Sequence, residues 1–203
     1  PPQTSLAQIM KILLLILAVL FIAFVIIQLW ARRGQKNIET YPYVVQKQYG
    51  ALEIRNYEAA LFTSVNTASE GYKRSSSRGF SILAGYIFGN NARNEKIAMT
   101  APVTMQLDDS VTMMFMVPKK YTKEALPQPN QPGITFKEEP AKTVAAISFR
   151  GWASDEKIEK YKRKLMAALE AEGIPYSNRF YFLGYNPPYE VFNRKNEVIV
   201  ELP

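Results

Sequence analysis

Two residue types are missing from this chain of 203 residues, which contains no histidine and no cysteine. Without histidine there is no ordinary Ser-His-Asp triad, and without both residues there is no common zinc site. The lack of cysteine means that no disulfide framework exists, so a reducing and an oxidising compartment are equally compatible with the chain. A phosphate-binding loop is also missing, because the glycines from Gly71 to Gly89 lack the spacing of a P-loop or a dinucleotide fingerprint.

Carboxylate pairs are the remaining candidates for acid–base chemistry. They stand at Asp108-Asp109, Glu138-Glu139 and Asp155-Glu156, which fit a turn, a strand end and a helix start. Each pair therefore has a sufficient structural reason, and the sequence nominates no catalytic residue and no metal ligand. An enzyme that uses Tyr, Lys or Glu as acid or base stays open.

One long hydrophobic run stands near the start of the chain. Residues 12–27 are all apolar, and only Gln28 interrupts the run before Trp30. Roughly 20 apolar residues match the ~30 Å hydrocarbon core of a bilayer. A cleaved signal usually has an apolar region of only ~7–15 residues and a small-x-small cleavage site. The sequence therefore predicts a retained transmembrane anchor within residues 1–36, followed by a domain over residues 37–203.

Charges beside this single-pass span bear on localisation. Lys11 precedes it, whereas Arg32, Arg33 and Lys36 follow it. This excess favours a cytoplasmic domain under the positive-inside bias, while the short N-terminal flank is typical of anchors that export their domain. Both sides of the membrane stay open, with the cytoplasmic side favoured.

The net charge of +7 does not indicate a nucleic-acid partner. Four of the 25 basic residues flank the span, which leaves 21 basic against 18 acidic residues in the rest of the chain. A nucleic-acid binder concentrates basic residues on one face. The densest basic cluster, residues 160–164, is better explained as the solvated face of a helix.

Hydrophobic periodicity predicts strands and two helices after the span. The helices are expected at residues 70–88 and 154–172, the second capped by Ser154. Each half of the domain then reads strands, helix, strands. The pattern predicts an α+β fold, a distorted antiparallel β-barrel of two pseudo-repeats with two flanking helices. Strands are expected at residues 43–47, 51–55, 60–66, 97–106, 111–118, 134–138, 143–150, 179–185 and 197–202.

Apolar and aromatic residues are abundant, with 12 tyrosines, 11 phenylalanines and seven methionines. Two adjacent strands carry Met99, Met105, Met113, Met114 and Met116. Methionine fills irregular cores and also makes adaptable ligand walls, and both interpretations stay open. On the first helix, Arg78 is a candidate partner for a ligand carboxylate, with plain solvation as the alternative.

Four sequence motifs in order resemble the SOUL haem-binding protein family over residues 39–202. They are ETYPYVV at residues 39–45, EIRNY at 53–57, KIAMTAPVTM at 96–105, and GYNPP at 184–188 followed by NRKNEV at 193–198. The resemblance implies the same barrel of two pseudo-repeats with two helices.

The resemblance also implies that haem or another tetrapyrrole binds in a shallow apolar groove. The first helix and the loop before the last strand would form it, which points to Phe80, Leu83, Ala84 and Ile87, and to Tyr189 and Arg194. Axial ligation by histidine is excluded in this chain, so an iron ligand would be Tyr, Met or Lys. Glu190 stands where a member of the family has a basic residue, and its carboxylate would repel a propionate.

The sequence therefore predicts a non-enzymatic binder or carrier of tetrapyrrole, anchored by one span and monomeric in its soluble domain. A sensor or scaffold domain for another hydrophobic small molecule is the first alternative. An enzyme that acts on such a ligand is the second.

Overall fold

The computed structural model describes residues 6–35, 38–67, 71–107 and 110–203, with side chains of 31–35 excepted. The expected turn at Asp108-Asp109 and Lys36 lie outside this description, as do the side chains of Arg32 and Arg33. The chain forms two compact units. One consists of residues 1–37 with residues 187–192, and the other of residues 38–186 with residues 193–203.

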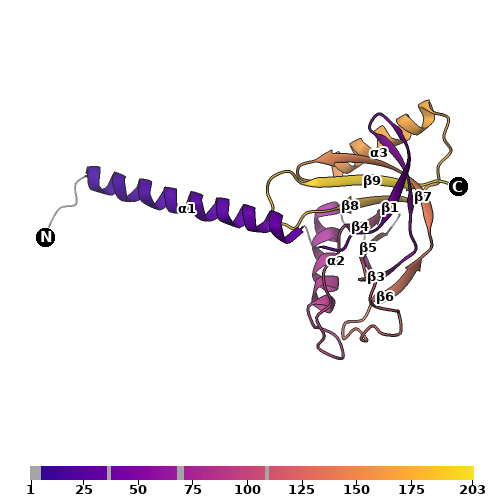
Figure 1. Ribbon diagram of the computed structural model, residues 1–203, viewed down its shortest axis with the longest axis horizontal. Coiled ribbons are helices and arrows are strands. Elements are labelled where there is room, and N and C mark those ends of the chain that lie inside the picture. Colours follow the sequence, from indigo (N-terminus) through magenta and orange to yellow (C-terminus); the bar gives the residue numbers. More distant parts are fainter. Residues whose placement is uncertain (1–5, 36–37, 68–70, 108–109) are drawn as a thin grey trace. The chain divides into compact units, whose positions relative to one another are not determined.

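The first unit contains helix α1 (Leu6–Gln35) and the loop of residues 187–192, called the β8–β9 loop below (Figure 1). Within α1, Leu6–Trp30 is apolar enough and long enough to cross a membrane, with a mean hydropathy of 3.3. A membrane span and a signal sequence both have this character.

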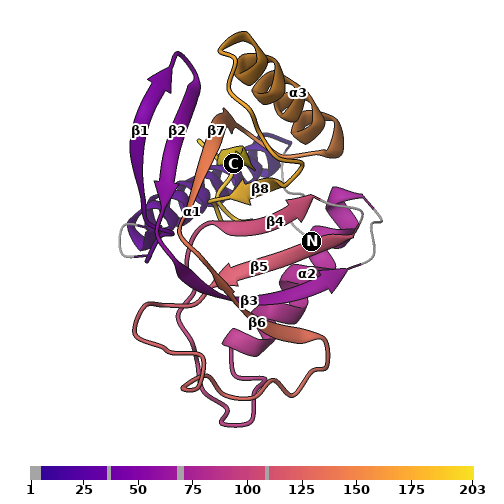
Figure 2. The same ribbon diagram turned by 90° about the vertical axis from the view of Figure 1, so that its right-hand side faces the viewer.

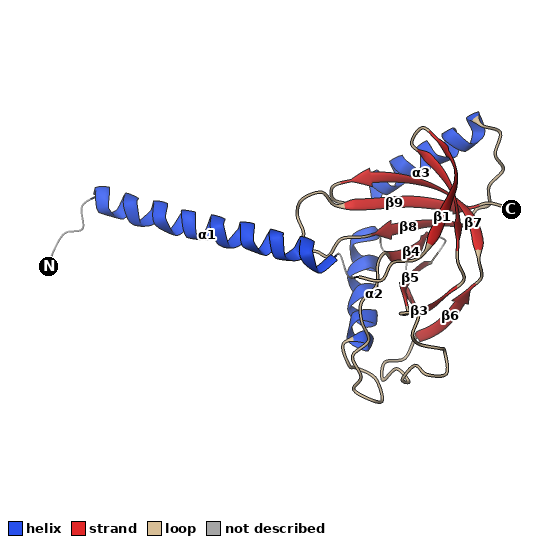
Figure 3. Ribbon diagram, in the orientation of Figure 1, coloured by secondary structure: helices blue, strands red, loops and turns tan. Residues whose placement is uncertain are grey.

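The second unit is a nine-stranded antiparallel sheet with two helices (Figure 3). The α+β fold predicted from the sequence is confirmed, and the strand order is β1-β2-β7-β9-β8-β4-β5-β3-β6. The strands are β1 (Tyr43–Tyr49), β2 (Leu52–Tyr57), β3 (Ala60–Thr67), β4 (Val103–Leu107), β5 (Val111–Met116), β6 (Ile134–Glu139), β7 (Lys142–Arg150), β8 (Phe180–Gly184) and β9 (Lys195–Glu201).

The order of the strands reveals the two pseudo-repeats. In the first half of the domain, helix α2 (Tyr72–Ile87) is followed by β4 and β5. In the second half, helix α3 (Asp155–Ala171) is followed by β8 and β9. Strands β4 and β8 pair with each other at the centre of the sheet. Outward from this pair the two sides read β5-β3-β6 and β9-β7-β2-β1. The first repeat thus places β1 and β2 beyond β7 of the second repeat, and the second repeat places β6 beyond β3 of the first, which ties the halves together.

Both helices cover the same face of the sheet. Helix α2 packs on β3 and β5, and lies behind them in Figure 2, whereas α3 packs on β7 and β9. Alternate strand residues form the core with them, as the two-residue period of a strand requires. Fully buried Leu83, Leu165 and Leu169 carry the helices into this core.

Local signals set the helix ends. Ser154 caps α3 as expected, since its hydroxyl accepts a hydrogen bond from the Lys157 amide at 3.3 Å.

The expected strand over residues 97–106 is wrong in its first half, because β4 begins only at Val103. Pro102 has no N–H to give to a ladder, and Thr100 instead donates its hydroxyl proton to the Met116 carbonyl at 2.7 Å.

Two glycines of α2 differ in their surroundings, so substitution by alanine is expected to have opposite effects on stability at the two positions. A Cβ at Gly79 would lie 2.9 Å from Met113 Cβ, whereas a Cβ at Gly85 meets no atom within 4 Å. We expect Gly79→Ala to lower the free energy of unfolding by about 1–2 kcal/mol through overpacking. Gly85→Ala should raise it by about 0.5–1 kcal/mol through helix propensity. Thermal unfolding of both variants measures this, and shifts of the same sign would contradict it.

Candidate ligand-binding site

The residues predicted on the first helix divide between the core and the surface. Leu83, Ala84 and Ile87 are buried against the sheet, and Phe80 is half-buried with its ring 5.4 Å from that of Phe115. Arg78 is exposed. A ligand would therefore reach the three buried side chains only if α2 moved away from the sheet, and their role in binding stays a prediction.

The two residues predicted before the last strand belong to different units. Tyr189 lies in the β8–β9 loop and is 53% exposed. Arg194 belongs to the sheet unit, where its guanidinium lies 4.2 Å from the centroid of the Trp152 ring and donates a hydrogen bond to the Asn186 carbonyl at 3.1 Å. Arg194 is thus a basic group held in place by a ring and a carbonyl.

A cleft of about 270 Å³ opens where the N-terminal ends of α2 and α3 meet strands β4 and β5. Its neighbours in sequence, residues 68–70 and 108–109, lie outside the described part of the chain. The walls are mainly apolar and the rim is polar. The walls are Tyr72, Met105, Leu107, Val111 and Ile158, and the rim is Gly71, Asp155, Glu159 and Lys162.

Asp155 builds this cleft by joining the two helices. Gly71, the N-cap of α2, has no side chain to cap the helix, and Asp155 Oδ1 instead accepts a hydrogen bond from the Tyr72 amide at 2.7 Å. The same carboxylate lies in the first turn of α3. An anionic group at two helix N-termini is favoured by both helix dipoles. Asp155 therefore has a structural task, as the sequence suggested.

Aromatic packing fixes the Tyr72 wall of the cleft. The Tyr72 ring meets the Phe182 ring edge-on, with centroids 5.2 Å apart. Burial raises the pKa of the Tyr72 hydroxyl, while the positive charge of Arg194 acts in the opposite direction. Tyr72 is therefore a neutral phenol at pH 7, within the electrostatic influence of Arg194.

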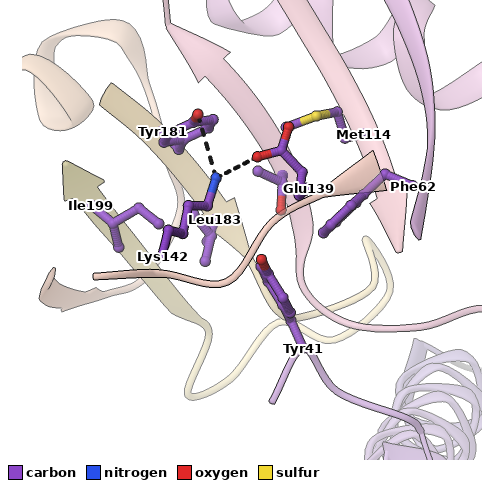
Figure 4. Close-up of a pocket in the computed structure, with 9 residues that line it drawn as sticks. Tyr41, Phe62, Met114, Glu139, Lys142, Tyr181, Leu183 and Ile199 are labelled. Atoms are coloured by element: carbon purple, nitrogen blue, oxygen red, sulfur yellow. Dashed lines mark hydrogen bonds and ion pairs between the residues drawn. The ribbon is translucent and has the colours of Figure 1, made fainter. Parts of the chain in front are cut away.

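A second hollow lies on the inner face of the curled sheet, away from the helices (Figure 4). Its volume is about 10 Å³, enough for one water molecule and far below the ~300–1,000 Å³ of small-molecule pockets. The Tyr41 hydroxyl and Thr104 Oγ1 are buried here without a hydrogen-bond partner among the described residues. This hollow is too small for a flat ring system.

The buried carboxylates of the inner face have basic partners. Glu139 pairs with Lys142 at 2.6 Å and with Lys137 at 2.7 Å. Burial opposes the ionised form of Glu139, but these lysines outweigh it and lower its pKa. A general acid at neutral pH needs a raised pKa, so this geometry suits structural ion pairing.

Comparisons with known proteins identify the family. The model of the SOUL heme-binding protein family matches residues 38–201. The chain belongs to this family. Heme-binding protein 2 of Mus musculus is 30% identical over 166 residues, which cover 77% of this chain and 80% of that protein. Heme-binding protein 1 of Xenopus laevis is 26% identical over 161 residues, which cover 75% of this chain and 84% of that protein.

Solved structures of low sequence identity share the SOUL fold. The EcmrR C-terminal domain has a TM-score of 0.60 and 13% identity, covering 75% of this chain and 96% of that domain. A hydrolase from Listeria innocua has a TM-score of 0.52 and 9% identity, covering 78% of this chain and 94% of that one. These similarities concern the fold alone.

The sequence nominates Arg194, whose role in binding stays a prediction, and it does not predict the cleft. The sequence places Met105 on a methionine-rich strand and Asp155 at a helix start, but it does not bring the two together. No local sequence pattern could have predicted the cleft, because it depends on a hydrogen bond between Asp155 and Tyr72, which are 83 positions apart in the sequence.

Proposed function

We propose that this SOUL-family chain is a membrane-anchored, non-enzymatic binder or carrier of haem or another tetrapyrrole. The observation that carries the proposal is the cleft between α2 and α3, which has five apolar wall residues with a lysine on its rim. The family's name and its relatives' name, heme-binding protein, give the class of ligand.

The residues of the cleft fit a flat apolar ring that bears carboxylates. The walls offer apolar contact, and a volume near the lower limit of small-molecule sites means that part of the ring stays in water. Lys162 on the rim and Arg194 near Tyr72 are suitable partners for propionates. Of the acidic rim residues, Asp155 already binds the Tyr72 amide and Glu159 pairs with Arg163 at 3.3 Å.

The cleft contains the three residue types that remain as iron ligands in this sequence. Tyr72, Met105 and Lys162 are all present, although Met105 is only 1% exposed and the Lys162 ammonium lies 4.5 Å from the Phe180 ring centroid. If haem binds, these residues would be the candidates to hold its iron, and binding without a protein ligand is the alternative. Tyr72 would first have to lose the proton that burial holds on it.

The membrane part of the proposal rests on α1. The apolar window Leu6–Trp30 ends in Trp30, an amphipathic ring that favours the membrane–water interface. A retained α1 would keep the binding domain at a bilayer surface, where an apolar ligand is concentrated.

A hemin titration of the full chain in lipid nanodiscs tests the binding proposal. We expect a saturable Soret shift at one hemin per chain. Arg194→Ala should weaken binding about tenfold or more, because a charged hydrogen bond contributes ~1.5–3 kcal/mol and 1.4 kcal/mol is a factor of ten. Arg93→Ala is the matched control, because Arg93 follows the C-terminal end of α2, whereas the cleft lies at its N-terminal end. The 16 residues of α2 span about 24 Å.

The absorption spectrum of bound hemin then tests the role of Tyr72 in the wall of the cleft. Tyr72→Phe should leave affinity nearly unchanged if the ring packs on the ligand, and should remove the tyrosinate band if the phenol binds iron. A Soret change no larger than that of an unrelated protein would contradict the proposal and favour another hydrophobic effector. An equal loss in Arg194→Ala and Arg93→Ala would move the site away from this cleft.

A further inference from the structure

A glutamine inside the apolar span joins α1 to the β8–β9 loop. Gln28 is only 8% exposed, although its neighbours on the helix are exposed. Its Nε2 donates a hydrogen bond to the Tyr189 carbonyl at 3.0 Å, and its Oε1 accepts one from the Val191 amide at 3.2 Å. Both ends of the amide are therefore used by the loop backbone, which is how a polar group is tolerated at membrane depth.

A second contact lies one helical turn away. Phe24 stands four residues before Gln28, on the same side of the helix. Its ring meets the Phe192 ring edge-on, with centroids 6.0 Å apart. The loop thus follows one face of α1 over the last two turns of the apolar window, the depth at which a span reaches the interface of the bilayer.

The side chains of the loop are arranged in the opposite way to those of a loop in water. Its one charged residue, Glu190, is 5% exposed, whereas Tyr189, Val191 and Phe192 are 53%, 42% and 52% exposed. These exposed side chains continue the apolar surface of α1, where Trp30 is 71% exposed. Apolar groups grouped beside a span mark a surface that lipid covers.

We propose that the β8–β9 loop is a second membrane-contacting element, which lies in the interfacial region of the bilayer and is held against α1 by Gln28. The occupant of the apolar surface formed by Tyr189, Val191 and Phe192 is lipid. Tyrosine favours this depth because its ring is apolar and its hydroxyl reaches water. The inference rests on the proposed retention of α1 as a membrane span.

The absence of native cysteine makes the test direct, because any single cysteine can be labelled alone. The full chain is reconstituted in phosphatidylcholine–phosphatidylglycerol vesicles with an environment-sensitive fluorophore at Val191→Cys. Leu17→Cys, in the middle of the span, reports on the anchor, and Lys160→Cys, exposed on α3, reports on water. Nitroxide quenchers are attached to lipids near the headgroup or near the chain end.

We expect the Val191→Cys label to show blue-shifted emission that the shallow quencher removes more strongly than the deep one. The Leu17→Cys label should respond most to the deep quencher, and the Lys160→Cys label to neither. Gln28→Leu keeps the helix apolar but removes both hydrogen bonds. It should return the Val191→Cys label towards water while the Leu17→Cys label stays unchanged.

Four results would overturn the inference, and they differ in what else they imply. A Val191→Cys label in water, with the Leu17→Cys label in lipid, overturns the loop's role and leaves the anchor standing. If the emission of the Leu17→Cys label is that of a label in water, both the proposed anchor and the inference are wrong. Blue-shifted emission at Val191→Cys that no lipid quencher affects shows that protein or a bound ligand covers the loop. A Gln28→Leu variant without effect removes the proposed means of attachment.

Discussion

Arg55→Met is expected to lower the free energy of unfolding by about 3–5 kcal/mol, because it leaves a buried carboxylate without its main partner. Arg55 and Glu197 are 2% and 0% exposed on the inner face of the sheet. The guanidinium donates two parallel hydrogen bonds to Glu197, of 2.8 Å to Oε2 and 2.9 Å to Oε1. Such a bidentate pair compensates two buried charges at once.

The same substitution is expected to change the pH dependence of stability. Burial opposes the ionised form of Glu197, but Arg55 outweighs it and lowers the Glu197 pKa from 4.5 to about 2. The pair therefore contributes its full stability above pH 4.5 and loses it as the pH falls towards 2. In Arg55→Met, the weaker partners Lys195 and Tyr185 are left to oppose the effect of burial on Glu197. The Glu197 pKa is therefore higher in the variant than in the unchanged chain. The deficit of the variant should be largest at neutral pH and should shrink as the pH falls.

Urea unfolding of the full chain in detergent micelles, followed by near-ultraviolet circular dichroism, measures this effect. Arg163→Met is the matched control, because the Arg163–Glu159 pair is exposed on α3 and such pairs contribute only ~0.2–1 kcal/mol. Arg55→Met with Glu197→Gln should recover much of the loss, since neither charge of this buried pair remains. Equal stabilities of Arg55→Met and Arg163→Met would show that the buried pair is not as described.

Leu83→Asp is expected to prevent stable folding of the sheet unit. Leu83 is 0% exposed between α2 and the sheet, and the substitution removes about 1.5–3 kcal/mol of apolar burial. It also places a carboxyl group among the apolar side chains of the core, at a further cost of several kcal/mol. Together these terms approach the whole stability of an ordinary domain, about 5–15 kcal/mol.

Ser81→Asp is the matched control for this prediction, because Ser81 is exposed on the same helix two residues earlier. It should change stability by no more than about 0.5 kcal/mol. Circular dichroism and expression of folded protein separate the two variants. If Leu83→Asp folded normally and lost hemin, Leu83 would face a ligand groove, as the family resemblance implies, and not the core.

Local patterns were enough to determine the elements of this protein. The period of the apolar residues gave both helices of the sheet unit and nearly all strands, because burial on one face is written directly into residue spacing. Ser154 and Gly173 mark the ends of α3 through chemistry confined to a few residues. The run of 16 apolar residues identified α1 in the same way.

Tertiary structure alone decided what the helices and loops do. The stripe of Leu83 and Ile87 is equally suited to a core and to a ligand groove, and only the packing of α2 on the sheet places it in the core. The cleft depends on Asp155 meeting Tyr72, and the loop's attachment depends on Gln28 meeting residues 161 and 163 positions away. Sequence spacing carries no record of such contacts, because a hydrogen bond between distant segments is selected by the whole fold and not by its neighbours in the chain.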